Sequence, residues 1–381
     1  MATNQYNPDY VIHPGEYIAE ILESREIKKR DLAERIGLSV KAVSQIINGK
    51  ALYSPDVALM LEKALQVDAR IWINLVEAYQ LHHARQKERR NLETERTREW
   101  VRRFPTADLK RLGFLDRTTK PEINADQLLR FFQVASPDVW DEYMEKQVVS
   151  YRKSSAFSES PEAIAVWLRL AEIAAEKVET QPYDRIAFRR LLTDLRSLTL
   201  ESPDRFLSEI AERCSSVGIA FVLVPVLKGT HISGAAFWLS AQKATAAVSL
   251  RYRTNDHFWF TFFHEAAHIF LHGKKAVFID GEEETSAREE EEANAFAGEL
   301  LIPRQEYAAF VQRGAFFPTK IEEFAGRIGI HPGIVVGRLQ HDRLIEYRWH
   351  NQLKEKIDAG GADQNLDYFA RGRPDYHTTS S

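Results

Sequence analysis

The segment HEAAH, residues 264–268, combines the residue types and the spacing of a metal-dependent hydrolytic site. On a helix, a step of four residues turns the chain by about 400°, so His264 and His268 would project from one face, one turn apart. Their imidazoles could bind one metal ion, and Glu265 beside them could accept a proton from water. The segment therefore predicts a zinc-dependent hydrolase, although the same residue types would also bind manganese or another divalent ion.

A buried helix is the element that must position this segment. Its neighbours are largely apolar, and no proline or glycine interrupts the chain over residues 257–272. His272 lies one further turn along, but three successive turns rarely converge on one tetrahedral ion, so we expect that it does not bind the metal. Three other histidines are expected at the surface or in packing contacts: His231, His331 and His341.

A third protein ligand must come from elsewhere, because a catalytic zinc ion takes three protein ligands and keeps one open position. The segment REEEEANAFAGELLIP, residues 288–303, predicts a second helix that is rich in carboxylates. Glu290 and Asn294 lie one turn apart in it, so Glu290 could bind the ion while Asn294 supports a ligand through a hydrogen bond. Because four glutamates run together, Glu289 and Glu291 remain alternatives for the ligand.

The stretch from about residue 219 to 344 resembles the ImmA/IrrE family of metallopeptidases. The segments that carry the resemblance are ISGAAFWLS, RYRTNDHFWFTFFHEAAHIFLH, EEEANAFAGELLIP and HPGIVVGRLQ. The resemblance implies a zincin-like α+β domain with a small sheet. It also implies a glutamate ligand three residues before an alanine, a pattern that falls on Glu290, Ala293 and Asn294. Peptide-bond hydrolysis, with helix-turn-helix repressors as substrates, is the activity that the resemblance implies.

Near the N-terminus, the segment KKRDLAERIGLSVKAVSQIINGK predicts a helix-turn-helix. One helix would span about Lys29 to Ile36, Gly37 would allow a tight turn, and Ser39 would cap a recognition helix that runs to about Asn48. The outer face of such a helix reads base edges with polar side chains and contacts phosphates with cations. The candidate base-reading residues are Ser44 and Gln45, the candidate phosphate contacts are Lys29, Lys41 and Lys50, and Asn48 lies near the same face.

With its flanks, about residues 8 to 81, this segment resembles the HigA-type antitoxin branch of the Cro/C1 (XRE) repressors. Lys29 stands where many such repressors have a glutamine that grips a phosphate. The resemblance implies binding to double-stranded operator DNA by a homodimer. The alternative is a helix-turn-helix that serves only protein contacts.

The sequence patterns predict a multi-domain, mainly α protein. We expect an all-α helix-turn-helix domain at 1–81, a charged connector and helical middle region at 82–212, the metallopeptidase domain at 213–356, and a flexible polar tail at 357–381.

The composition excludes some classes of protein. Cys214 is the single cysteine of the 381 residues, so the chain forms no internal disulfide and no cysteine-based zinc site, and we expect this thiol to be buried. No apolar run approaches the roughly 20 residues that cross a bilayer, and residues 1–10 lack a basic start followed by an apolar stretch. We therefore expect a cytoplasmic protein.

The charged residues are distributed unevenly along the chain, although the net charge is only −4. A basic run lies at residues 85–117 and an acidic run at residues 280–292, and we expect residues 282–284 of the acidic run to face solvent.

Together these features predict a transcriptional regulator with a zinc-dependent endopeptidase domain. Its substrate would be a partner helix-turn-helix repressor or the chain itself, in a stress, toxin–antitoxin or mobile-element circuit. The alternative is a HigA-like repressor or antitoxin whose metal-binding domain senses a signal or binds a partner such as a toxin, with little or no proteolysis. A purely structural zinc site is disfavoured because it would not require Glu265.

Overall fold

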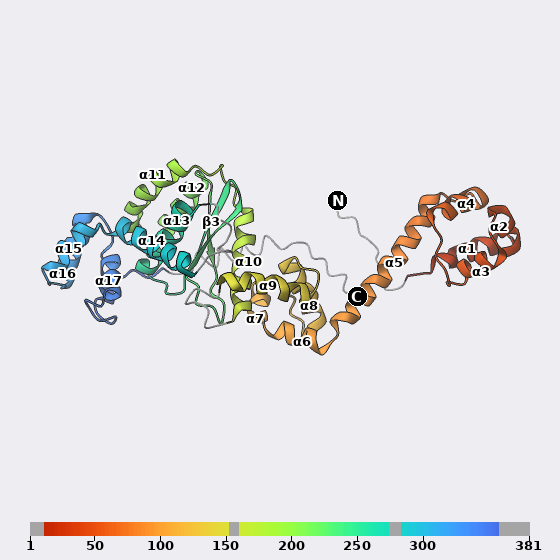
Figure 1. Cartoon of the computed structure of the whole chain (residues 1–381), viewed down its shortest axis with the longest axis horizontal. Helices are drawn as coiled ribbons and strands as arrows, with labels where there is room; N and C mark the ends of the chain where they lie inside the picture. The colour runs from red at the N-terminus through yellow and green to blue at the C-terminus, as the bar shows by residue number, and fades with distance from the viewer. Residues whose placement is uncertain (1–10, 152–159, 274–282, 358–381) are drawn as a thin grey trace. The chain divides into compact units, whose positions relative to one another are not determined.

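The computed structural model describes residues 11–151, 160–273 and 283–357. For residues 145–151 and 283–287 it describes the backbone alone. These residues form two compact units, one up to Glu95 and one from Arg96 onward, and the chain is mainly helical (Figure 1). The mainly α, multi-domain class that the sequence predicts is confirmed. Of the tail predicted to be flexible, Ile357 is described and is fully buried, while residues 358–381 and the acidic residue Glu282 lie outside the described residues.

The first unit is built from short helices with local start and stop signals. Pro14 and Pro55 each stand at the first position of a helix, where a missing N–H costs no hydrogen bond. The Ser39 hydroxyl caps the recognition helix by accepting a hydrogen bond from the Ala42 backbone N–H at 3.1 Å. The helices are α1 (Pro14–Ser24), α2 (Lys29–Ile36), α3 (Val40–Ile47), α4 (Pro55–Leu65) and α5 (Ala69–Leu92).

The turn between α2 and α3 depends on glycine. Gly37 has φ 67°, in the left-handed region that a residue with a Cβ rarely adopts. Gly15 in α1 is equally constrained, because a Cβ there would lie 2.1 Å from the Ile46 carbonyl oxygen of α3. The helix-turn-helix predicted for residues 29–48 is present as α2 and α3. The long helix α5 runs across position 81, and the domain boundary predicted there remains a prediction.

The second unit begins with helices that the sequence predicts for its middle region. Pro137, Pro161 and Pro203 are each the first residue of a helix. Arg103 joins these elements by ion pairs of 2.7 Å to Asp141 and 2.8 Å to Glu162. The elements are α6 (Glu95–Arg102), α7 (Thr106–Arg111), α8 (Pro121–Phe132), α9 (Pro137–Tyr151), α10 (Pro161–Lys177), α11 (Arg185–Leu195), the 3-10 helix η2 (Arg196–Leu200) and α12 (Pro203–Ser215).

A three-stranded sheet follows, with the order β1-β3-β2. Its strands are β1 (Ile219–Val224), β2 (Gly234–Ser240) and β3 (Lys243–Ser249); β3 pairs in parallel with β1 and antiparallel with β2. The middle strand is buried along almost its whole length, because α10 packs against the sheet as well as α13 (Figure 1). Helix α11 precedes the predicted boundary at 213 and α12 runs across it, and both share the core beside this sheet.

The remaining helices carry the predicted metal ligands. The predicted helix at 257–272 is α13 (Asn255–Leu271), which buries Trp259, Phe262 and Phe263 completely in the core. The predicted second helix is α14 (Glu283–Leu301), which begins earlier than expected. The others are α15 (Arg304–Gln312), α16 (Pro318–Ile328), α17 (Pro332–His341) and the 3-10 helix η3 (Asn351–Leu353). No helix within the described part of the chain has the length and apolar character needed to span a membrane.

A buried ion pair anchors the beginning of α13. Lys354 Nζ lies 2.6 Å from Asp256 Oδ2 and donates to Gln340 Oε1 at 2.7 Å, and the Lys354 and Asp256 side chains are 10% and 6% exposed. Next to this pair, the Asn255 backbone N–H donates to the Glu355 carbonyl oxygen at 3.0 Å. Lys354 and Glu355, which follow η3, therefore hold the N-terminal end of α13, the helix that carries His264 and His268.

Replacing Lys354 with methionine is expected to lower the free energy of unfolding by about 3–5 kcal/mol, because Asp256 would remain buried without its partner. Urea denaturation of the full chain followed by tryptophan fluorescence measures the change. The matched control is Lys320→Met, since the Lys320–Glu323 pair is exposed (53% and 63%) and its loss should cost less than about 1 kcal/mol. If both variants lose the same free energy of unfolding, the Lys354–Asp256 pair does not stabilise the fold as a buried ion pair.

Candidate functional site

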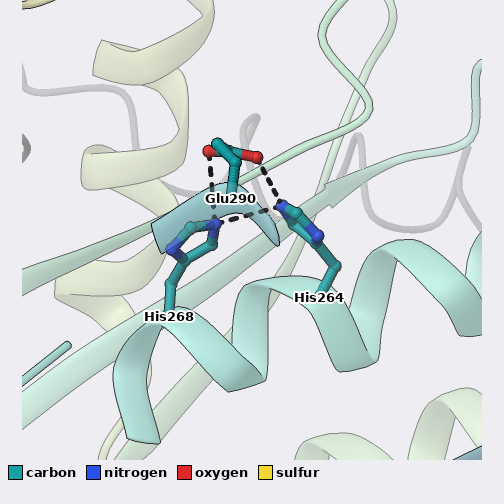
Figure 2. Close-up of side chains that lie close together, drawn as sticks. All are labelled: His264, His268 and Glu290. Carbon is teal, nitrogen blue, oxygen red and sulfur yellow. Dashed lines mark hydrogen bonds and ion pairs between the residues drawn. The ribbon is translucent and has the colours of Figure 1, made fainter. Parts of the chain in front are cut away.

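Helices α13 and α14 lie side by side and bring three predicted ligands together (Figure 2). His264 and His268 project from one face of α13, and their Nε2 atoms are 3.0 Å apart. Glu290 on α14 faces both rings, with Oε2 at 3.3 Å from His264 Nε2 and Oε1 at 3.4 Å from His268 Nε2. Of the three adjacent glutamates considered from the sequence, Glu290 is therefore the one that meets the histidine pair.

The geometry of these three side chains fits a divalent ion. One ligand atom from each residue lies within 4.8 Å of the others. In a tetrahedral zinc site with bonds of roughly 2.0–2.2 Å, ligand atoms are about 3.3–3.6 Å apart. The two separations between a histidine Nε2 and a Glu290 oxygen, 3.3 and 3.4 Å, fall in this range. His264 Nδ1 lies 3.0 Å from Asn294 Oδ1. Because an amide oxygen only accepts, the proton of a neutral His264 ring belongs on Nδ1, which leaves the Nε2 lone pair for a metal.

The charges in this cluster reinforce one another. Hydrogen bonds from His264 and His268 hold the pKa of the Glu290 carboxyl well below its ordinary value. Burial lowers the pKa of His264, but its hydrogen bond to Glu290 and the nearby carboxylates together raise that pKa above its ordinary value. Glu290 is therefore ionised at neutral pH, which is the state that a carboxylate ligand needs.

Glu265 lies on α13 directly beside the cluster and is 7% exposed. Burial raises the pKa of its carboxyl, although the charges of His264 and His268 oppose the shift. A carboxylate with a raised pKa accepts a proton more readily near neutral pH than an exposed one does. Its place depends on Gly234 at the start of β2, where a Cβ would lie 2.6 Å from Glu265 Oε1.

The other histidines lie in different surroundings. His272 Nδ1 is 3.0 Å from His268 Nδ1, the ring nitrogen that does not face Glu290, so His272 does not point at the cluster. His331 caps α17 by accepting a hydrogen bond from the Gly333 N–H at 3.1 Å, and His341 pairs with Asp342 at the surface. Among the described residues, the one group with metal-ligand geometry consists of His264, His268 and Glu290.

Cys214 is fully buried, as expected, and burial raises the pKa of its thiol. Neither a nucleophilic nor a metal-binding role is consistent with a buried, protonated thiol.

The predicted DNA-contact residues lie on or beside α3 of the first unit, except Lys29, which is the first residue of α2. Lys29, Lys41, Gln45 and Lys50 are exposed, whereas Ser44 is half-buried and its hydroxyl accepts a hydrogen bond from Asn48 Nδ2 at 3.1 Å. The Ser39 hydroxyl is used by the helix cap. Of the two base-reading candidates, Gln45 is thus the one that presents an exposed side chain.

Two family models match separate parts of the chain. The description of one is a helix-turn-helix, at residues 18–72, and that of the other is the IrrE N-terminal-like domain, a metallopeptidase family, at residues 250–339. The chain is a helix-turn-helix regulator that also carries an IrrE-like domain. This combination confirms the two domain types predicted from the sequence. Membership of this peptidase family implies a divalent metal, and the residues at 264, 268 and 290 have the chemistry to hold one.

The N-terminal part of this regulator is similar to shorter proteins. It is 28% identical over 71 residues to YddM, an uncharacterized HTH-type transcriptional regulator of Escherichia coli K12, which covers 19% of this chain and 76% of YddM. A candidate antidote protein of a plasmid maintenance system from Nostoc punctiforme is 37% identical, over 22% of this chain and 91% of that one, with a TM-score of 0.21. An addiction module antidote protein of a HigA family from Coxiella burnetii is 33% identical, over 22% and 92%, with a TM-score of 0.21.

Sequence reasoning did not find the roles of two residues near the cluster. Gly234 is 31 positions from Glu265, and nothing in the segment ISGAAFWLS signals that contact. Glu292 was part of the acidic run, but its 3.4 Å approach to His272 Nε2 depends on how α14 packs beside α13.

Proposed function

We propose that this chain is a DNA-binding transcriptional regulator whose IrrE-like domain is a zinc-dependent endopeptidase. The observation that carries the proposal is the convergence of His264, His268 and Glu290, with Glu265 buried beside them. A purely structural zinc site would be complete without Glu265. Because burying a carboxylate costs free energy, its position beside the ligands favours a catalytic role.

The residues divide the chemistry among them. The two imidazoles and the Glu290 carboxylate would hold the ion, which supplies a Lewis acid that polarises a carbonyl group and makes water more acidic. Asn294 would keep the His264 ring in the required tautomer through the 3.0 Å contact. Glu265 would accept a proton from water and pass it to the nitrogen of the departing amine.

An extended peptide is the substrate that the neighbouring strand favours. Among the described strands, β2 pairs with β3 on one side only. Its first residue is Gly234, which lies against the Glu265 side chain. A peptide that adds to the other edge of β2 by backbone hydrogen bonds would lie next to the strand whose first residue contacts Glu265. This arrangement supports cleavage within an unfolded or loop segment of a protein.

Cleavage can be tested by incubating the purified full chain with zinc and a helix-turn-helix protein encoded beside it, and by following the fragments with mass spectrometry. We expect zinc-dependent fragments of the partner or of the chain itself, and EDTA should prevent their formation. A chain that binds zinc and cleaves neither protein would support the second candidate, a repressor or antitoxin with little turnover. The 33% identity of its N-terminal part to a HigA family antidote protein favours that candidate.

For the DNA-binding part, we propose that α3 binds double-stranded operator DNA and that the chain acts as a homodimer on a twofold site. Lys41→Ala is expected to weaken binding to all sequences and to lower the salt dependence by about one phosphate contact. Gln45→Ala is expected to reduce discrimination between operator and altered sites by about 1–3 kcal/mol.

Fluorescence anisotropy with promoter DNA at several salt concentrations measures both effects. Lys63→Ala on α4, outside the two helices of the helix-turn-helix, serves as the control. DNA affinity that does not fall as the salt concentration rises would count against this interface. So would a Gln45→Ala chain that discriminates between operator and altered sites as well as the wild type does.

A further inference from the structure

We propose that His272 and Glu292 form a relay that fixes the orientation and the tautomer of His268, the ring that meets Glu290. The proposal rests on the proposed metal site and adds two positioning residues to it. Neither residue would touch the ion or the substrate. Their task would be to set how well His268 serves as a ligand.

The contacts form a continuous chain away from the cluster. His268 uses Nε2 toward His264 and Glu290, while its Nδ1 lies 3.0 Å from His272 Nδ1. The other nitrogen of His272, Nε2, lies 3.4 Å from Glu292 Oε2. The second oxygen of Glu292 accepts a hydrogen bond from Arg288 Nε at 2.9 Å. The relay thus connects the end of α13 to α14.

With a metal bound to His268 Nε2, one arrangement of protons would satisfy the contacts from His268 to His272 and from His272 to Glu292. A ring that binds a metal through Nε2 must leave that atom unprotonated, so the neutral His268 ring carries its proton on Nδ1. This N–H donates to His272 Nδ1, which must therefore be an acceptor. The proton of His272 then belongs on Nε2, where it donates to the Glu292 carboxylate. Each hydrogen bond points from the ligand toward a negative charge.

The two histidine ligands would be supported in different ways. His264 donates to a neutral amide oxygen of Asn294, whereas His268 would reach a carboxylate through a second imidazole. Outer partners of this kind fix the ring and increase its basicity. The His268 and His272 side chains are only 5% and 10% exposed, so water screens their contact little, while Glu292 is 43% exposed. We therefore expect His272 to matter more than Glu292.

Zinc affinity of the full chain, measured by competition with a chelator, tests the relay. His272→Ala is expected to bind zinc about 10–100-fold more weakly than the wild type. His272→Asn places an acceptor oxygen near the position of Nδ1 and should recover part of the loss, and Glu292→Gln should show a smaller loss than His272→Ala. The matched control is Glu291→Gln, an exposed neighbour in the same acidic run, which should bind zinc as the wild type does.

Two further measurements separate positioning from a general structural role. Thermal unfolding in EDTA should give the same midpoint for the wild type and His272→Asn, because the relay acts through the metal. Histidine-ring nitrogen NMR of the zinc-loaded chain should place the His272 proton on Nε2. Equal zinc affinity of His272→Ala, His272→Asn and the wild type, or a proton on His272 Nδ1, overturns the relay alone. A wild-type chain that binds no zinc overturns the proposed function and the relay together.

Discussion

Glu265→Gln is expected to keep the metal and to lose peptide hydrolysis. The amide has nearly the shape of the carboxylate, so it fits the buried position against Gly234 without a new steric contact. It cannot accept a proton from water at neutral pH, and general acid–base catalysis contributes on the order of 10²–10⁴ in rate. We therefore expect the cleavage rate to fall by at least about 100-fold while zinc content is unchanged.

The measurement combines zinc content with the rate at which a partner protein or the chain itself is cut. Glu291→Gln is the control for loss of one negative charge near the site. A Glu265→Gln chain that cleaves at the wild-type rate would refute the assigned role. The same variant also distinguishes the two candidate functions: if promoter control in cells is unchanged while cleavage is lost, regulation does not depend on proteolysis.

Glu290→Ala is expected to cause the largest loss of zinc affinity among the acidic residues of α14. It removes the carboxylate that faces both histidine rings at 3.3 and 3.4 Å. Since loss of an outer partner alone typically costs 10–100-fold in affinity, loss of this direct ligand should exceed about 100-fold. Cleavage should disappear with the metal.

Chelator competition applied to Glu289→Ala, Glu290→Ala and Glu291→Ala determines which of the adjacent glutamates binds. The first and third variants should retain the wild-type zinc affinity within a few-fold, because neither side chain belongs to the cluster of ligand atoms. If zinc is lost with Glu289→Ala or Glu291→Ala but kept with Glu290→Ala, the ligand assignment is wrong. Unfolding in EDTA checks that each variant is folded.

The helix-turn-helix was predictable because its signals are local. Gly37 permits the left-handed turn, Ser39 caps the following helix, and the apolar spacing predicts which faces are buried. Likewise, the placement of His264 and His268 on one face follows from the helical repeat alone. These features need no information beyond about ten neighbouring residues. The start of an element was less predictable, as the early start of α14 illustrates.

The sequence by itself therefore determined the HEAAH helix, the position of His264 and His268 on one face of it, and three adjacent glutamates as candidates for the third ligand. The tertiary structure decided that Glu290 meets both rings, that His272 faces the far nitrogen of His268, and that Gly234 lies against Glu265. The physical reason is that helical geometry relates residues within one element. Contacts between α13, α14 and β2 instead depend on how whole elements pack around the shared apolar core.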